Sequence, residues 1–287
     1  MSDSNKKKKA SLDIVLANTY ASEANKVAHS GYLTRAGKIR ESNRIAELLV
    51  AGAAKRKIKI QYDIAYDGHP HELSFTECFG GMGGVYIRPA DSNLSRQMLA
   101  SPFRATRDIN FLLNAEDKYA QLPIHCPVDH VIFLPGTNLL DRYKAEVFRP
   151  YYREGVKVKP HPITSEYFRF LLLREFGSDV LPLKGSAQSI LKQVKEVTVT
   201  QHTEMGLYAL LQGKKVNVIP AMKGLLPVYR YFYETGERLK EVLSSHLSGL
   251  FFMNDNIEEQ IEEWFDYYQS QSQLRQTRFF DVFGGKR

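Results

Sequence analysis

Three short polar segments, each lying between an apolar run and a helical pattern, carry side chains suited to binding an anion. They are Leu134–Asn138, Lys159–Pro162 and Thr200–Gly206. Glycine lets the backbone approach a ligand closely, and hydroxyl or amide groups cap the following helix, whose free N–H groups attract negative charge. This chemistry predicts phosphate binding. The candidate ligands are Gly136, Thr137, Lys159, His161, Gln201, His202, Thr203 and Glu204.

The imidazole of His161 lies between Pro160 and Pro162, directly after the apolar run Val156–Val158. Proline restricts the backbone, so the ring is presented rigidly, and Lys159 adds a positive charge beside it. A histidine in this setting can donate a hydrogen bond to a phosphate and stabilise a departing phosphate group. Taken alone, each segment has a simpler interpretation. Lys159–Pro162 would be a rigid turn, and each of the other two segments would be an ordinary helix cap. Their repeated strand–loop–helix order favours a shared anion site.

The strands and helices that hold these segments can be predicted from the second half of the chain, where apolar runs alternate with helical patterns. Short apolar runs at Val131–Leu134, Val156–Val158, Val180–Leu183, Val197–Thr200 and Val216–Ile219 alternate with helical patterns at Ser165–Phe176, Ala187–Val194 and Met205–Leu211. Such alternation predicts an α/β fold with a parallel, doubly wound sheet covered by helices on both faces. Ligands of these sheets bind at the carboxyl ends of the strands, where the three segments are expected.

The rest of the chain is less regular. We expect helices over Lys38–Lys55, Ser92–Ala100 and Thr106–Tyr119, a half-buried strand over Lys57–Tyr62, and a helical C-terminus from Leu226. In that C-terminus a stripe at helical spacing is expected to be core: Ile257, Ile261, Trp264, Phe265 and Tyr268. The proline-containing stretch Gln121–Asp129 is the candidate linker, which predicts domains at 1–125 and 126–287.

Two stretches carry a resemblance to a known family. Lys159–Pro162 reads K-P-H-P, and Val197–Val216 reads V-T-V-T-Q-H-T-E-M-G-L-Y-A-L-L-Q-G-K-K-V. They resemble the donor-binding half of glycosyltransferases with the GT-B fold, and are similar to the patterns of bacterial sialyl- and Kdo-type transferases. The resemblance covers about a quarter of the chain and hardly touches the first half.

The resemblance implies two Rossmann-like domains and a nucleotide-sugar donor whose phosphates are held at His161, Thr203 and His202. It implies no metal cofactor, and the chain has no Asp-x-Asp triplet. This sequence departs from the family at Tyr208, where many members have the glutamate that binds ribose. Glu204, one helical turn earlier, is the candidate substitute, and the identity of the nucleotide stays open.

Transfer of a sugar to a hydroxyl group also needs a general base on the acceptor side. The candidate catalytic pair is Asp67, on a tight turn after the strand expected over Lys57–Tyr62, together with His161. An Asp-Gly turn without catalytic function is the alternative for Asp67. The competing groups are Asp63, Glu72, Asp91, His69 and His71. The cluster Gly80–Gly84 is either an acceptor-side loop or a flexible connection.

Positive charge is concentrated near the N-terminus. The formal net charge is +7, and residues 1–60 contain thirteen Lys and Arg against five Asp and Glu. Such a surplus is typical of a protein that binds a polyanion, although a solvated lysine tail gives the same count. The candidate nucleic-acid-binding residues are Arg35, Lys38, Arg40, Arg44, Lys55, Arg56 and Lys57.

Composition excludes several classes of protein. The 287 residues are 43% hydrophobic and 25% charged, as in ordinary globular proteins, and runs such as Phe170–Leu173 are far shorter than the roughly 20 apolar residues of a membrane-spanning helix. The N-terminus lacks the apolar segment of a secretory signal, and Cys78 and Cys126 match no metal-ligand spacing. We therefore expect a cytoplasmic protein, in the host cytoplasm if viral, without a membrane span.

Three functions remain. The first hypothesis is a metal-independent glycosyltransferase that moves a sugar to a hydroxymethylated base in DNA, as in bacteriophages, because the basic surplus lies in the acceptor half. The second is a transferase of CMP-linked sugars in bacterial capsule or lipopolysaccharide synthesis, with an anionic glycan as partner. The third is a non-catalytic nucleotide- or nucleic-acid-binding protein.

Overall fold

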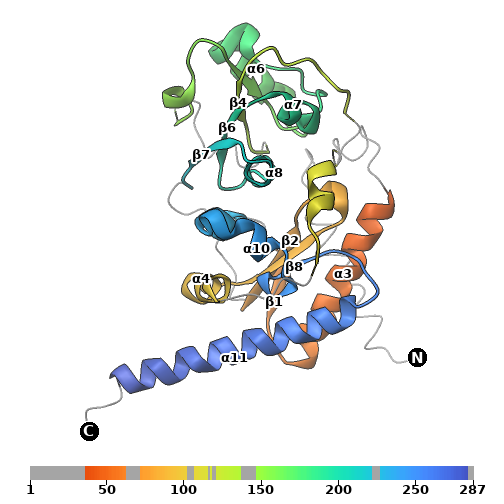
Figure 1. The fold of residues 1–287 in the computed structure, drawn as a ribbon, viewed down its shortest axis with the longest axis vertical. Coiled ribbons are helices and arrows are strands. Elements are labelled where there is room, and N and C mark those ends of the chain that lie inside the picture. Colours follow the sequence, from red (N-terminus) through yellow and green to blue (C-terminus); the bar gives the residue numbers. More distant parts are fainter. Residues whose placement is uncertain are drawn as a thin grey trace.

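The computed structural model is an α/β protein with two four-stranded sheets (Figure 1). It describes residues 36–62, 72–101, 107–115, 117, 121–136, 147–221 and 227–283. The strands are β1 (Ile60–Tyr62), β2 (Leu73–Glu77), β3 (Val85–Pro89), β4 (His130–Phe133), β5 (Val156–Lys159), β6 (Glu196–Thr200), β7 (Lys215–Ile219) and β8 (Leu250–Phe251). The helices are α3 (Ala36–Lys55), α4 (Ser92–Ala100), α6 (Glu166–Phe176), α7 (Ala187–Gln193), α8 (Met205–Leu211), α9 (Arg230–Glu234), α10 (Leu239–Leu243) and α11 (Ile257–Phe283).

The first sheet has the order β1-β2-β3-β8 and is mixed. β1 runs parallel to β2, whereas β2, β3 and β8 pair antiparallel, with Phe75 opposite Ile87 and Val85 opposite Phe251. The expectation of two Rossmann-like domains is therefore not confirmed, because a Rossmann sheet is built from parallel strands. β8 joins this sheet from the C-terminal part of the chain, although the domain boundary expected at 125/126 would place it with the other sheet.

Helices α3, α4 and α11 pack with the first sheet. α11 contacts both α3 and α4, and Figure 1 shows it across the end of the molecule opposite the parallel sheet. Ile45 and Leu49 of α3 are fully buried against apolar side chains of the sheet and of α11. The five residues of the predicted C-terminal stripe are all buried in α11, so the helical C-terminus is confirmed.

The second sheet is parallel, as expected, with the order β5-β4-β6-β7. Val180 adds a single parallel bridge to Val158 of β5. Only this bridge remains of the strand expected over Val180–Leu183, because Pro182 has no N–H to donate to a ladder. If the bridge at Val180 is counted as a third position between β5 and β6 in the chain, the order across the sheet is 3-2-1-4-5, which matches that of a Rossmann sheet. The order reverses between β4 and β6, and ligands of such sheets bind at that point.

One apolar core joins the two sheets. It contains Cys78 and Phe79 after β2, Val131 of β4, Val197 of β6 and Leu207 of α8. The two parts of the molecule are therefore packed together through buried side chains.

One expectation for the connecting segments needs correction. The helix expected over Thr106–Tyr119 is, among its described residues, only a 3-10 turn at Asn110–Asn114, whose entry is fixed by the Asp108 carboxylate on Asn110 N–H at 2.9 Å. The stretch expected as a linker lies against α7: Gln193 donates to Ile124 O at 2.9 Å and accepts from Cys126 N at 3.0 Å.

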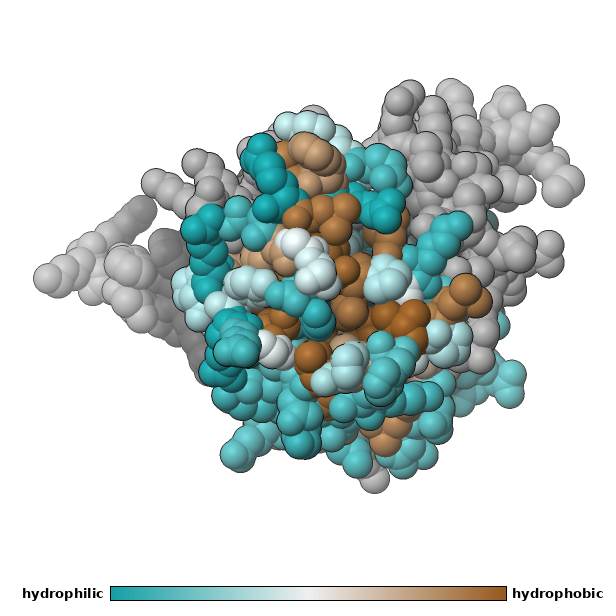
Figure 2. Space-filling model, turned by 90° about the horizontal axis from the view of Figure 1, so that it is seen from above, coloured by the Kyte–Doolittle hydropathy of each residue, from teal (hydrophilic) through white to brown (hydrophobic). Residues whose placement is uncertain are grey.

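Helix α6 leaves apolar side chains uncovered at one end of the molecule. Tyr167, Phe170 and Leu173, spaced three residues apart, have exposures of 67%, 61% and 43%. Figure 2 looks onto this end and shows hydrophobic residues gathered in the middle of the face within a hydrophilic rim.

Candidate functional site

A cavity of about 320 Å³ opens at the carboxyl ends of β4, β5 and β6. One wall is formed by the segments that follow these strands: Phe133–Gly136, Lys159–Ile163 and His202–Met205. The opposite wall comes from the first sheet, with Thr76 and Glu77 at the end of β2. The cavity thus lies where the strand order of the parallel sheet reverses, and it is closed from the other side by the mixed sheet.

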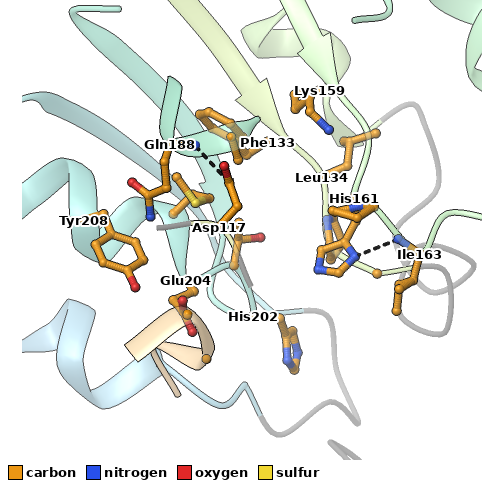
Figure 3. A pocket seen from close by; sticks show the side chains of 18 of the residues that line it. Asp117, Phe133, Leu134, Lys159, His161, Ile163, Gln188, His202, Glu204 and Tyr208 are labelled. Atoms are coloured by element: carbon orange, nitrogen blue, oxygen red, sulfur yellow. Dashed lines mark hydrogen bonds between the residues drawn. The ribbon is translucent and has the colours of Figure 1, made fainter. Parts of the chain in front are cut away.

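His161 lines the cavity, and its ring is oriented by its own loop (Figure 3). Ile163 N donates to His161 Nδ1 at 3.3 Å, and Thr164 N donates to His161 O at 2.9 Å. Because Nδ1 accepts a hydrogen bond, the neutral ring carries its proton on Nε2. The loop therefore fixes which ring nitrogen of the neutral imidazole carries the proton, and holds the ring in the cavity wall.

Lys159, the last residue of β5, also lines the cavity but is only 2% exposed. Its Nζ donates to Pro160 O at 2.6 Å and to Leu183 O at 3.1 Å. Burial lowers the pKa of Lys159 to about 7, against a smaller opposing effect of the Asp117 carboxylate. The positive charge that the sequence places beside His161 is thus held by backbone carbonyls.

The segment after β6 divides into residues that reach the cavity and one that does not. His202 and Thr203 line it and are buried. The Thr203 hydroxyl lies 3.0 Å from the Thr200 hydroxyl, and His202 N donates to Thr200 Oγ1 at 3.3 Å. Gln201 is not in the lining; its side-chain oxygen accepts from Ala221 N at 3.1 Å.

Glu204 lines the cavity and connects the two sheets. Its Oε2 accepts from Phe79 N at 2.6 Å and from Tyr229 Oη at 3.2 Å. Phe79 has a left-handed backbone, with φ of 51°, which directs its N–H to this carboxylate. Tyr208, at the position of the family's ribose-binding glutamate, is buried edge-on against Phe79, with 4.9 Å between ring centroids. Burial, with the nearby Glu204 charge, raises the pKa of Tyr208 well above its usual range.

Two glycines of the family-like stretch have structural roles. A Cβ on Gly206 would lie 2.2 Å from Tyr233 Oη, so glycine here lets Tyr233 reach Thr203 O, to which it donates at 2.6 Å. Gly213 has a φ of +70° and ends α8, with Lys214 N donating to Ala209 O at 3.0 Å. Both residues shape α8 and its connection to β7.

The sequence did not single out several groups that line the cavity. Thr76 and Glu77 end β2 just before the glycine cluster that the sequence did single out, and Gly80 and Gly81 of that cluster line the same wall. The available signal for Thr76 and Glu77 is a polar pair at the end of a short strand that alternates apolar and polar residues. Asp117 had no local signal, since its carboxylate accepts from Ser186 Oγ and from Gln188 N at 3.2 Å, about 70 positions away (Figure 3).

The base predicted at Asp67 lies outside the described residues, as do Thr137, Asp63, His69 and His71. Two of its competitors are described and have structural contacts. Glu72 accepts from Lys59 N at 2.9 Å, and Asp91 caps α4 and pairs with Arg275. Gly136 lines the cavity as expected.

Six of the seven predicted nucleic-acid-binding residues, those from Lys38 to Lys57, lie on or just after α3. Arg44 pairs with Glu258 at 3.1 Å, Lys55 with Glu262 at 3.2 Å, and Arg56 with Glu262 and Asp266, each at 2.8 Å. These carboxylates belong to α11, so three of the seven cations have acidic partners within the molecule. Lys57 is exposed. Arg35 lies outside the described residues, as do the side chains of Lys38 and Arg40.

No protein-family model and no curated protein matches this chain. Within the described ranges, no group of three or more His, Cys, Asp or Glu side chains is arranged to hold a metal ion. In the same part of the chain, no helix has the length and apolar character needed to cross a membrane.

Proposed function

We propose that this protein is a GT-B-like glycosyltransferase that uses a nucleotide-activated sugar. The observation that carries the proposal is the cavity at the reversal point of a Rossmann-ordered sheet, with His161 on one wall and Glu77 on the facing wall. Reversal points of such sheets bind nucleotides. The facing domain, built on a mixed sheet, makes this a variant of the two-domain plan.

The donor phosphate is assigned to the wall formed by the parallel sheet. Gly136 permits close backbone approach after β4, and His161 presents Nε2–H after β5. A hydrogen bond from this group becomes stronger as negative charge develops on the phosphate oxygen that leaves the sugar. His161 thereby stabilises the leaving group.

The acceptor is assigned to the wall formed by the mixed sheet, and Glu77 is assigned as its base. Glu77 ends β2 at that wall and lines the cavity, facing the segments that follow the parallel strands. In the proposed step, Glu77 takes the hydroxyl proton and the acceptor oxygen bonds to the anomeric carbon. The bond from that carbon to the phosphate oxygen breaks, and its electron pair leaves with the nucleotide.

A test of the function is product mass after incubation with a panel of UDP- and CMP-linked sugars and hydroxyl acceptors, including hydroxymethylated DNA. We expect a mass increase of one sugar with one of the donors. Tight binding of UDP or CMP without transfer or donor hydrolysis in any combination would instead support a non-catalytic nucleotide-binding protein.

Glu77→Gln tests the base. We expect kcat to fall about 100-fold, with donor affinity unchanged, because the amide cannot accept the proton. Glu72→Gln, on an exposed residue outside the cavity, is the matched control and should retain activity. Unchanged kcat in Glu77→Gln would remove Glu77 from the mechanism.

The acceptor class has two candidates. DNA is proposed from the N-terminal basic surplus, and an anionic glycan is the alternative; the pairing of Arg44, Lys55 and Arg56 with α11 leaves fewer unpaired cations for either polyanion. Binding to duplex DNA across a salt series tests the first candidate. Affinity that falls steeply with salt supports DNA, and weak, salt-independent binding argues against it.

A further inference from the structure

We propose that Lys159 is a positioning residue that holds His161 at the cavity, and that it is not itself a ligand of the donor phosphate. This inference rests on the proposed function for its catalytic consequence. Its structural basis is independent of that function: a lysine 2% exposed whose Nζ donates to two backbone carbonyls, Pro160 O at 2.6 Å and Leu183 O at 3.1 Å.

These two hydrogen bonds fix the loop at both sides. Pro160 immediately precedes His161, so the bond to Pro160 O orients the peptide group that carries His161. Leu183 follows the bridge at Val180, so the second bond ties this loop to the neighbouring connection. Leu134 N also donates to Lys159 O at 3.0 Å, which joins the loop after β4 to the same point. The three connections at the sheet end are thus held together around Lys159.

The number of donors argues against a phosphate contact. An ammonium group has three N–H donors, and two of them are occupied by Pro160 O and Leu183 O. The pKa of Lys159 is about 7, so near neutral pH much of the population is the amine, which has only two N–H donors. The amine can keep both carbonyl bonds but has no donor left for a ligand.

The position of the groups agrees with this division of roles. Figure 3 shows the Lys159 amine at one side of the cavity, apart from the rings of His161 and His202. The Asp117 carboxylate near Lys159 is itself bound to Ser186 Oγ and Gln188 N, so it too belongs to the supporting structure. His161 is the group of this loop that is oriented toward a ligand.

A double-mutant cycle tests the inference in the transfer reaction. Lys159→Met keeps the length and apolar stem but removes the donors. We expect Lys159→Met and His161→Ala each to lower kcat by a similar factor, and the double variant to be no worse than His161→Ala alone, because both remove the same oriented imidazole. Losses that multiply in the double variant would show an independent phosphate contact and overturn the proposal. Lys192→Met, on the exposed side of α7, is the matched control and should be unaffected.

A measurement on the unmodified protein keeps the test independent of folding and of activity. Lysine and histidine NMR signals are followed in pH titrations without ligand and with UDP or CMP as probes. We expect the His161 ring signals to show a hydrogen bond to the nucleotide phosphate and the Lys159 amine signals to show none, whatever the through-space effect of the phosphate charge on the Lys159 titration. A scalar coupling across a hydrogen bond between Lys159 Nζ and the nucleotide phosphorus would contradict the inference, even if no donor sugar were ever transferred.

Discussion

The loop after β5 and the helix α3 both carry cations that the sequence predicts to bind anions, but the two regions differ in what surrounds those cations. At the sheet end, Lys159 is bound to backbone carbonyls and His161 lies on the cavity wall. On α3 and just after it, Arg44, Lys55 and Arg56 face carboxylates of α11 that follow 206 to 214 positions later in the chain. The topology of a parallel sheet determines where the loop after a strand lies. The partner of a cation on a helix depends instead on which distant segment packs against that helix.

The largest difference between the two regions is expected in catalysis. His161→Ala should lower kcat about 100- to 1,000-fold, the usual cost of losing one donor to a developing negative charge. Arg44→Gln, at the α3–α11 contact, should leave kcat at saturating substrate unchanged. Steady-state kinetics with the active donor gives both values. An unchanged turnover in His161→Ala would remove the functional contrast between the regions.

The second expected difference concerns stability at different pH values. The pKa of Lys159 is about 7 in the folded chain and about 10.5 when exposed, so the unfolded chain binds more protons between these values. The free energy of unfolding should therefore rise with pH from about 7 to about 10.5, by a few kcal/mol for so large a shift. Lys159→Met should lack this rise.

Urea unfolding of both proteins at pH 7 and pH 9.5 measures that difference, and the comparison cancels the other titrating groups, which the two proteins share. Parallel pH profiles would mean that the Lys159 amine is not buried in solution.

A smaller effect is expected at the α3–α11 contact. The Arg56 side chain is 11% exposed, binds Glu262 and Asp266, and lies 4.8 Å from the centre of the Phe265 ring. Arg56→Met should cost about 1–2 kcal/mol of stability, because it removes charged hydrogen bonds from a mostly buried group. Lys55→Met, at a side chain that is itself 69% exposed, should cost under about 0.5 kcal/mol. Equal losses in chemical denaturation would show that burial does not distinguish these two pairs.

The smallest expected effect is at Lys57, which follows α3 with a left-handed φ of 59°. Ile58 N donates to Ala53 O at 2.9 Å across this residue, the arrangement of a helix end that favours glycine. Lys57→Gly should stabilise the protein by about 0.5–1 kcal/mol through relief of the backbone strain. Lys57→Ala removes the same charge but keeps the backbone strain. An equal gain in stability in Lys57→Ala would therefore show that the effect comes from the lost charge.

The sequence predicted the features that depend on neighbouring residues. The five apolar runs located the parallel sheet except at Pro182, and Gly136, Lys159, His161, His202, Thr203 and Glu204 all line one cavity. The last strand of the mixed sheet was missed because β8 pairs with β3 only through contacts more than 160 positions apart. Asp117 and the acidic partners of α3 depend on similarly distant packing, which no local pattern records.

The late position of β8 and α11 also has a consequence for the order in which the molecule is made. The parallel sheet is complete once β7 ends at Ile219, whereas the mixed sheet gains its last strand at Leu250 and its covering helix after Ile257. During synthesis, the side chains of α3 and β2 that α11 later covers are exposed until almost the whole chain has emerged. We therefore expect nascent chains halted near residue 245 to protect the parallel sheet from protease while α3 and β2 are still cut. The half of the protein that is translated first would then be the half that folds last.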